Sequence, residues 1–139
     1  MLKTKLLHPE ILSALGRAGH GSKVLIADGN YPFITRSHPN AQRVFLNLAP
    51  GLLTVTDVLR VLVEAIPIEA AEVMQPASGE EPSIFADFRK ILPGDLALKP
   101  LGRFEFYDAA SHPDTALVIA TGEQRIYANI MLTIGTVLP

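Results

Sequence analysis

The chain has 139 residues, of which 48% are hydrophobic and 19% charged, and its 12 Lys and Arg against 14 Asp and Glu give a net charge of −2. This length predicts one domain spanning residues 1–139, and the apolar composition excludes intrinsic disorder. The charge balance excludes a broad basic surface for nucleic acid, and the lack of cysteine excludes disulfide frameworks and thiolate chemistry.

The N-terminal third predicts a helix, a strand and a long loop. Apolar residues at helical spacing indicate a helix over Pro9–Ala18, with proline suited to its first turn and Gly19 ending it. Val24–Ala27 is a short run of mostly branched apolar residues, which is typical of a buried strand. Residues 31–42 contain two prolines and show no clean period, so we expect a loop.

The next segment predicts a second strand over residues 43–48 and a helix over 55–66. Thr54, with Asp57 three residues later, forms the pattern of a capping box directly before an apolar helical series. Pro50 and Gly51 indicate a turn between the two elements.

The remaining chain alternates strands and helices. We expect a strand over 68–74, an exposed linker over 75–83, helices over 83–91 and 103–110, and strands over 116–120 and 127–132. Strands alternating with helices indicate an α/β fold, in which a central mixed sheet is covered by helices on both faces.

No apolar run reaches the roughly 18 residues that cross a bilayer. The longest candidate, Val58–Ile66, is interrupted by Arg60 and Glu64. The first residues carry neither a long apolar segment nor a cleavage site. We therefore expect a cytoplasmic protein without a membrane partner, whose apolar excess is explained if it buries surface against other copies of itself.

Among four histidines, only His20 stands in a distinctive context, between Gly19 and Gly21. Two flanking glycines free the backbone and clear space around the imidazole, as a ligand contact requires. The alternative is that both glycines only shape the turn between the first helix and the first strand. No pair of histidines has metal-ligand spacing, so we expect no metal site.

Asp28 directly follows the first predicted strand. Ligands of open α/β sheets gather beyond the carboxyl ends of strands, where a carboxylate can bind sugar hydroxyls or orient a histidine. The alternative is an Asx turn with Gly29 and Asn30.

Two pairs of polar residues share a face of a predicted element. Arg103 and Tyr107 are four apart on a helix, so a guanidinium and a phenol can meet one ligand, unless they are only a surface pair. Tyr127 and Asn129 alternate along the last predicted strand, and an asparagine can both donate to and accept from neighbouring hydroxyls. The alternative is a core tyrosine beside an edge asparagine.

Six short blocks follow one another along the chain: Met1–Thr4, Gly19–Gly21, Ala27–Asp28 with Pro32, Arg103–Tyr107, Thr121–Glu123 and Tyr127–Ile130. In this order and spacing they resemble the RbsD/FucU family. The resemblance implies a sugar mutarotase, either a ribose pyranase or a fucose mutarotase, in a ring-shaped homo-oligomer that is typically a decamer of two pentamers.

The resemblance also implies roles for individual residues. His20 matches the catalytic acid/base histidine, Asp28 a sugar-binding aspartate, and Arg103 the sugar-binding arginine of the fucose branch. The substrate-contacting tripeptide near the C-terminus is matched by Tyr127, Ala128 and Asn129. Tyr107 and Glu69 fall where animal fucose mutarotases place a catalytic tyrosine and an acidic residue, the latter usually an aspartate.

The choice between the fucose mutarotase and ribose pyranase branches of the family depends on fewer positions. The Arg103–Tyr107 and Thr121–Glu123 blocks resemble fucose mutarotases, whereas Ala128 at the centre of the tripeptide resembles the ribose pyranases. Gly29–Pro32 also departs from the Ala-His-Phe-Pro of bacterial fucose enzymes. L-Fucose is the expected substrate, with D-ribose or another sugar as the alternative.

Mutarotation opens a cyclic hemiacetal and recloses it on the other face of the carbonyl. It needs groups that donate and accept protons near neutral pH, and an imidazole with an ordinary pKa of about 6.5 suits that task. We therefore expect an isomerase that needs no cofactor. A ring that binds sugar without catalysis is the alternative from a different functional class.

Overall fold

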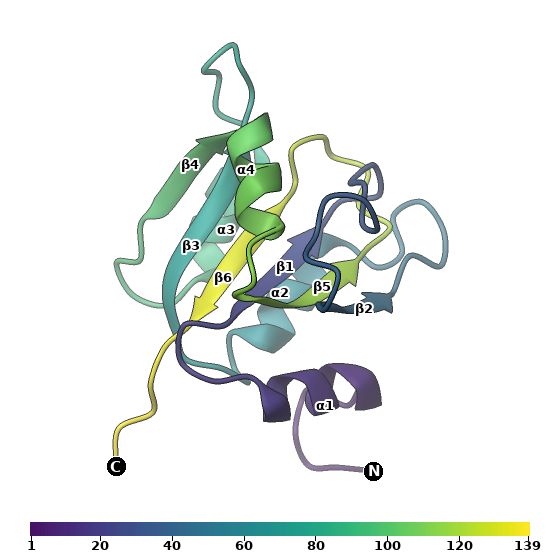
Figure 1. Cartoon of the computed structure of the whole chain (residues 1–139), viewed down its shortest axis with the longest axis vertical. Helices are drawn as coiled ribbons and strands as arrows, with labels where there is room; N and C mark the ends of the chain where they lie inside the picture. The colour runs from purple at the N-terminus through teal and green to yellow at the C-terminus, as the bar shows by residue number, and fades with distance from the viewer.

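A six-stranded mixed sheet in the order β2-β5-β1-β6-β3-β4 forms the centre of the molecule in the computed structural model, which describes all 139 residues (Figure 1). Its strands are β1 (Lys23–Ala27), β2 (Gln42–Phe45), β3 (Ile68–Gln75), β4 (Leu98–Gly102), β5 (Thr115–Ala120) and β6 (Ile130–Ile134). The helices are α1 (Pro9–Arg17), α2 (Val55–Leu62), α3 (Ile84–Ile91) and α4 (Arg103–Ala110).

Only β6 runs against the direction of the other strands. The carboxyl ends of the five parallel strands therefore lie at one edge of the sheet, the upper edge in Figure 1. The two chain termini and the loop between α1 and β1 lie at the opposite end. This polarity places the loops that follow strands at a single end of the molecule.

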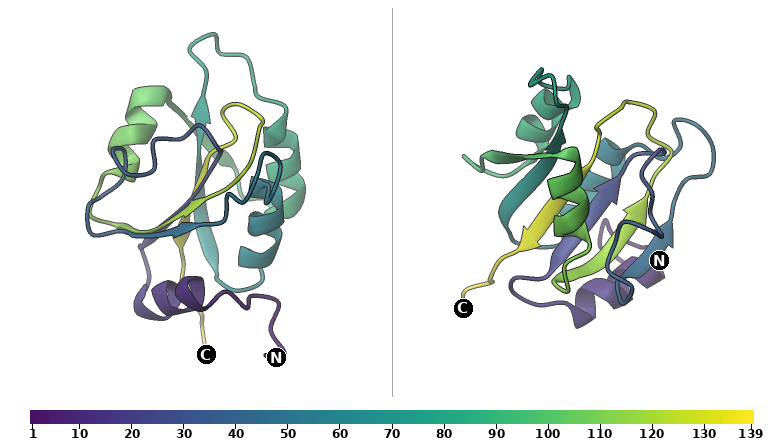
Figure 2. Two further views of the ribbon diagram at one scale, coloured as in Figure 1. Left: turned by 90° about the vertical axis from the view of Figure 1, so that its right-hand side faces the viewer. Right: turned by 45° about the horizontal axis from the view of Figure 1, so that its top comes forward.

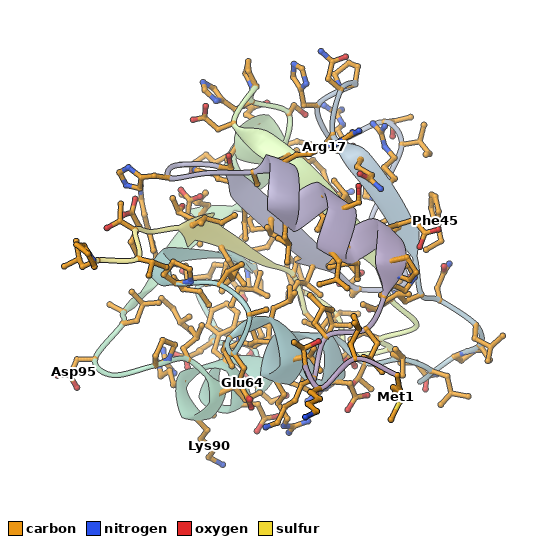
Figure 3. The ribbon with its side chains drawn as sticks, turned by 90° about the horizontal axis from the view of Figure 1, so that it is seen from below. Met1, Arg17, Phe45, Glu64, Lys90 and Asp95 are labelled. Atoms are coloured by element: carbon orange, nitrogen blue, oxygen red, sulfur yellow. The ribbon has the colours of Figure 1, made fainter.

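Helices cover both faces of the sheet, which confirms the expected α/β architecture. α1, α2 and α3 pack on one face, around a core that includes Leu59, Ile119 and Phe88 (Figure 2). α4 packs on the other face, where a second buried cluster includes Phe106 and Met131. In the view from below, α1 lies across the sheet and Phe45, at the end of β2, points away from it (Figure 3). None of the helices is long and apolar enough to cross a membrane.

The start of α2 shows the predicted capping box. Asp57 N–H donates to Thr54 Oγ1 (3.2 Å), and Thr54 N–H donates to Asp57 Oδ2 (3.0 Å). The two hydrogen bonds satisfy backbone donors that have no partner within the helix. The helix itself ends at Leu62, four residues before the predicted end.

Two predictions at the carboxyl end of the chain were wrong. Strand β4 was missed because Leu98–Gly102 contains Pro100, which lacks a backbone donor; the strand lies at the sheet edge, where such a residue is tolerated. The last strand begins at Ile130 and not at Tyr127, whose φ of 59° is incompatible with a strand.

Candidate functional site

A hollow of about 170 Å³ opens at the upper edge of the sheet, beyond the carboxyl ends of β1 and β3. Nine residues line it: Asp28, Asn30, Tyr31, Met74, Arg103, Tyr107, Ile126, Tyr127 and Asn129. Five of the residues singled out from the sequence are among them, although Asp28 and Asn129 are 101 positions apart in the chain. The hollow is of the size of one small ring compound.

Asp28 and Asn129 form a buried pair at the base of this hollow. Asn129 Nδ2 donates to Asp28 Oδ2 (3.0 Å), and Asp28 N–H donates to Asn129 Oδ1 (2.8 Å). They meet because β1 and β6 are antiparallel neighbours, so the residue after β1 lies beside the residue before β6. Asn30 N–H also donates to Asp28 Oδ1 (2.9 Å), so the Asx turn that was the alternative interpretation of Asp28 is present.

Burial raises the pKa of the Asp28 carboxyl group above its ordinary value. Hydrogen bonds from the Asn30 backbone and the Asn129 side chain act in the opposite direction without cancelling the effect of burial. The site thus contains a carboxylate that gains a proton at a higher pH than an exposed aspartate does.

Arg103 and Tyr107 meet on one face of α4, as their spacing predicted. Arg103 Nε donates to the Tyr107 hydroxyl oxygen (3.1 Å), and the Tyr107 side chain is buried. The terminal nitrogens of Arg103 make no hydrogen bond within the chain, so they are free to donate to a ligand.

Tyr127 lies in the loop between β5 and β6 with a left-handed backbone conformation, at φ 59°. This conformation is uncommon for a residue with a large side chain, and it turns the ring into the wall of the hollow. Ala128 is completely buried in the core on the other side of the sheet, so its side chain does not line the hollow.

His20 lies outside this hollow. It stands in the loop before β1, whereas Asp28 follows β1, and five residues of strand alone span about 16 Å. The idea that Asp28 orients this histidine within one chain is therefore wrong. Instead, His20 Nε2 lies 2.9 Å from Glu69 Oε2, and both side chains are about half exposed, at 59% and 45%.

An ion pair that the sequence analysis missed holds the β5–β6 loop. Glu123 is buried, and Arg125 donates to both of its carboxylate oxygens, from Nε (2.9 Å) and Nη2 (2.8 Å). Arg125 Nη1 also donates to Asp87 Oδ2 on α3 (3.0 Å), and Val55 N–H at the start of α2 donates to Glu123 Oε2 (3.3 Å). These contacts fix the loop that carries Tyr127.

The Glu123→Gln variant is expected to lose about 1–3 kcal/mol of folding stability at neutral pH, because it removes a charged acceptor of several hydrogen bonds. Burial raises the pKa of Glu123, but the bonds and charge of Arg125 outweigh burial and leave this pKa below its ordinary value. The stabilisation is therefore present above the unfolded pKa of about 4.3 and is lost as pH falls through the lower folded pKa.

Urea unfolding at neutral and acidic pH measures this effect, with Glu80→Gln, at an exposed position, as the control. Equal stability of wild type and Glu123→Gln at both pH values would contradict the assignment.

Four lining residues were not predicted: Asn30, Tyr31, Met74 and Ile126. Asn30 and Tyr31 follow Asp28 after one glycine, and Met74 lies near the carboxyl end of β3. The rule that ligands gather beyond the carboxyl ends of strands, which led to Asp28, therefore applied to them too. Ile126 gave no signal in the sequence. No group of three His, Cys, Asp or Glu side chains is arranged to hold a metal ion.

Comparisons with known proteins agree on one family. The model of the "RbsD / FucU transport protein family" matches residues 1–137. The fucose mutarotase of Bos taurus is 32% identical over 96% of this chain and 92% of its own. The D-ribose pyranase of Variovorax paradoxus is 31% identical over 97% and 98%. The crystal structure of the Streptococcus pneumoniae fucose mutarotase in complex with L-fucose superimposes with a TM-score of 0.84 at 26% identity, covering 99% of this chain and 100% of that one.

Proposed function

The chain belongs to the RbsD/FucU family, and we propose that it is a sugar mutarotase, an isomerase that interconverts the α and β anomers of a monosaccharide. One observation carries the proposal: the hollow brings a buried carboxylate–amide pair, Asp28 and Asn129, next to a phenol–guanidinium pair, Tyr107 and Arg103. The first pair suits recognition of neighbouring hydroxyls, and the second suits proton transfer.

In this proposal the sugar lies in the hollow with its hydroxyl groups held by Asp28, Asn129 and Arg103. The ring of Tyr127, at the wall of the hollow, covers an apolar face of the sugar. The backbone of Ala128 fixes the spacing between its two neighbours, since its side chain is buried on the far side of the sheet.

Ring opening requires that the anomeric hydroxyl lose a proton while the ring oxygen gains one. Tyr107 donates a proton to the ring oxygen, and the resulting phenolate is stabilised by Arg103 Nε. A base removes the proton of the anomeric hydroxyl, and the anomeric carbon becomes a free carbonyl. The carbonyl then rotates, so that its other face meets the hydroxyl group formed from the ring oxygen, and this oxygen bonds to the carbonyl carbon again. The hydroxyl proton returns to Tyr107 and the base returns its proton to the carbonyl oxygen, which gives the other anomer.

We propose that the base is His20 of a neighbouring copy, accompanied by Glu69. The hollow and His20 lie at opposite ends of one chain, and a head-to-tail contact between copies brings opposite ends together and closes a ring. Such a contact also covers exposed apolar residues at both ends, Ile126 and Phe104 near the hollow and Val137 in the C-terminal tail. A decamer of two stacked pentameric rings is the assembly we expect.

The contact with Glu69 prepares His20 for this role. A carboxylate next to Nε2 favours the tautomer that carries its proton on Nε2, so the lone pair lies on Nδ1. Nδ1 makes no hydrogen bond within the chain and is free to take a proton from the sugar. Glu69 Oε2 accepts a hydrogen bond from Nε2 throughout this step.

Arg103→Ala is expected to weaken sugar binding about 10- to 100-fold, because it removes a charged donor of hydrogen bonds. Titration calorimetry with the sugar measures the change. Arg60→Ala, on the exposed face of α2, is the matched control and leaves the affinity at the wild-type value. Unchanged affinity in Arg103→Ala would count against its role.

L-Fucose is the substrate that we propose, with D-ribose as the alternative, since relatives of similar identity carry either name. Magnetisation-exchange NMR between the anomeric protons of each sugar, with and without protein, tests both whether the protein is a mutarotase and which of the two sugars is its substrate. Positioned acid and base groups predict an acceleration of about 10²–10⁴-fold for the true substrate.

A non-catalytic sugar-binding ring is the second candidate, favoured by the position of His20 outside the hollow of its own chain. Binding of either sugar without any acceleration of exchange would support this second candidate over the mutarotase.

A further inference from the structure

A second, larger hollow of about 520 Å³ lies directly beside the hollow that contains Asp28 and Asn129, in which we place the sugar. Asn30 lines both, so the two are neighbours along the same edge of the sheet. Its walls are the loop after β2, with Asn47, Leu48 and Pro50, and the loop after β5, with Gly122 and Gln124. Figure 2 shows these loops side by side with the loop after β1. The proposed reaction leaves this space unused.

The floor of the second hollow is fixed by backbone contacts. Gly51 N–H donates to Gly122 O (2.6 Å), and Gly122 N–H donates to Leu53 O (2.8 Å). A Cβ atom on Gly122 would overlap the carbonyl oxygens of Ala49 and Leu52, so only glycine allows the two loops to approach this closely. The hollow is therefore already formed before any ligand binds.

The lining combines polar and apolar groups and offers no free charge to the hollow. The side-chain amides of Asn30, Asn47 and Gln124 make no hydrogen bond within the chain, so their donors and acceptors are free. Glu123, the one acidic lining residue, is engaged by Arg125. Leu48, at 85% exposure, adds an apolar surface.

Free amides together with an apolar surface match the chemistry of a sugar, which has hydroxyl groups at its edge and C–H groups on its faces. An anion finds no free cation among the residues that line this hollow, and an apolar group would leave the amides without partners.

We propose that the second hollow binds a further sugar residue that is joined to the sugar in the first, so that the substrate class includes reducing disaccharides. This inference rests on the proposed mutarotase function. The reaction is unchanged, because the reducing-end sugar still carries the hemiacetal and the glycosidic bond stays intact. Asn30 lies where the linkage between the two sugars passes.

The test compares anomer exchange of L-fucose and D-ribose with exchange of disaccharides that carry the same sugar at the reducing end and differ in linkage position. Wild-type protein is expected to accelerate exchange in the free sugar and in at least one of its disaccharides. Asn47→Trp and Gln124→Trp fill the second hollow at exposed positions, and each is expected to lower disaccharide exchange at least about tenfold. Exchange of the free sugar stays within about twofold of wild type.

Lys90→Trp, on α3 away from both hollows, controls for the effect of an added aromatic ring. The inference is overturned if the free sugar is accelerated and no disaccharide is, or if both tryptophan variants leave disaccharide exchange at the wild-type rate. If the free sugar itself is not accelerated, the mutarotase function fails and this inference fails with it.

Discussion

Replacing His20 with alanine is expected to abolish accelerated anomer exchange, a loss of about 10²–10⁴-fold, while the fold is retained. His20 is exposed, and its only side-chain partner is Glu69, which is also partly exposed, so its removal leaves no cavity in the core. Exchange NMR gives the rate, and circular dichroism reports the fold. His112→Ala, an exposed histidine in the loop before β5, is the matched control and keeps wild-type activity.

Mixing variants tests where His20 acts. Asn129→Ala damages the hollow and His20→Ala damages the opposite end, so each protein alone is inactive in our account. In assemblies formed by co-expressing both, the His20→Ala copies supply intact hollows and the Asn129→Ala copies supply intact His20. With random mixing, about one contact in four joins two intact parts, so about a quarter of wild-type activity is expected to return. Activity in pure His20→Ala, or no recovery in the mixed assemblies, would contradict the shared site.

The Asp28→Asn variant has the second-largest expected effect, a loss of about 100-fold in kcat/KM, because an ionised acceptor of sugar hydroxyls becomes neutral. Since burial raises the pKa of Asp28, the wild-type enzyme is expected to lose activity on the acid side above pH 3.9, the ordinary aspartate value. The sign follows from protonation: as pH falls through the raised pKa, the carboxylate is lost.

The pH profile of kcat/KM measures this effect, and the acid limb assigned to Asp28 disappears in Asp28→Asn. Asp108→Asn, at an exposed position of α4, is the control and retains the limb. A wild-type rate together with a wild-type pH profile in the Asp28→Asn variant would show that Asp28 does not bind the substrate.

The sequence predicted elements well where local patterns and burial agree. The capping box of α2 and the apolar strand β1 are examples, since each combines a local signal with burial in the core. β4 was missed because Pro100 contradicts a strand locally, and only the position at the sheet edge makes it acceptable. The start of β6 was predicted at Tyr127 because the left-handed backbone of this residue depends on the packing of the loop, which the local sequence does not show.

The site was predicted in part for a related reason. Asp28 and the Arg103–Tyr107 pair follow from rules about strand ends and helix spacing, and the structure brings them into one hollow. The ion pair of Glu123 and Arg125 and the second hollow depend on three segments that meet only in the folded chain. Thr121–Glu123 stood out in the sequence only as a family block, and no local pattern indicated the contacts that these residues make.

The family match and the geometry of the hollow support the proposal that this chain catalyses the exchange of sugar anomers. The most direct measurement is the exchange rate between the α and β anomeric protons of L-fucose and D-ribose as a function of protein concentration. We expect a rate that rises in proportion to wild-type protein for one of these sugars and stays at the buffer rate with His20→Ala. Saturable binding of the sugars with exchange at the buffer rate at every wild-type concentration would contradict it.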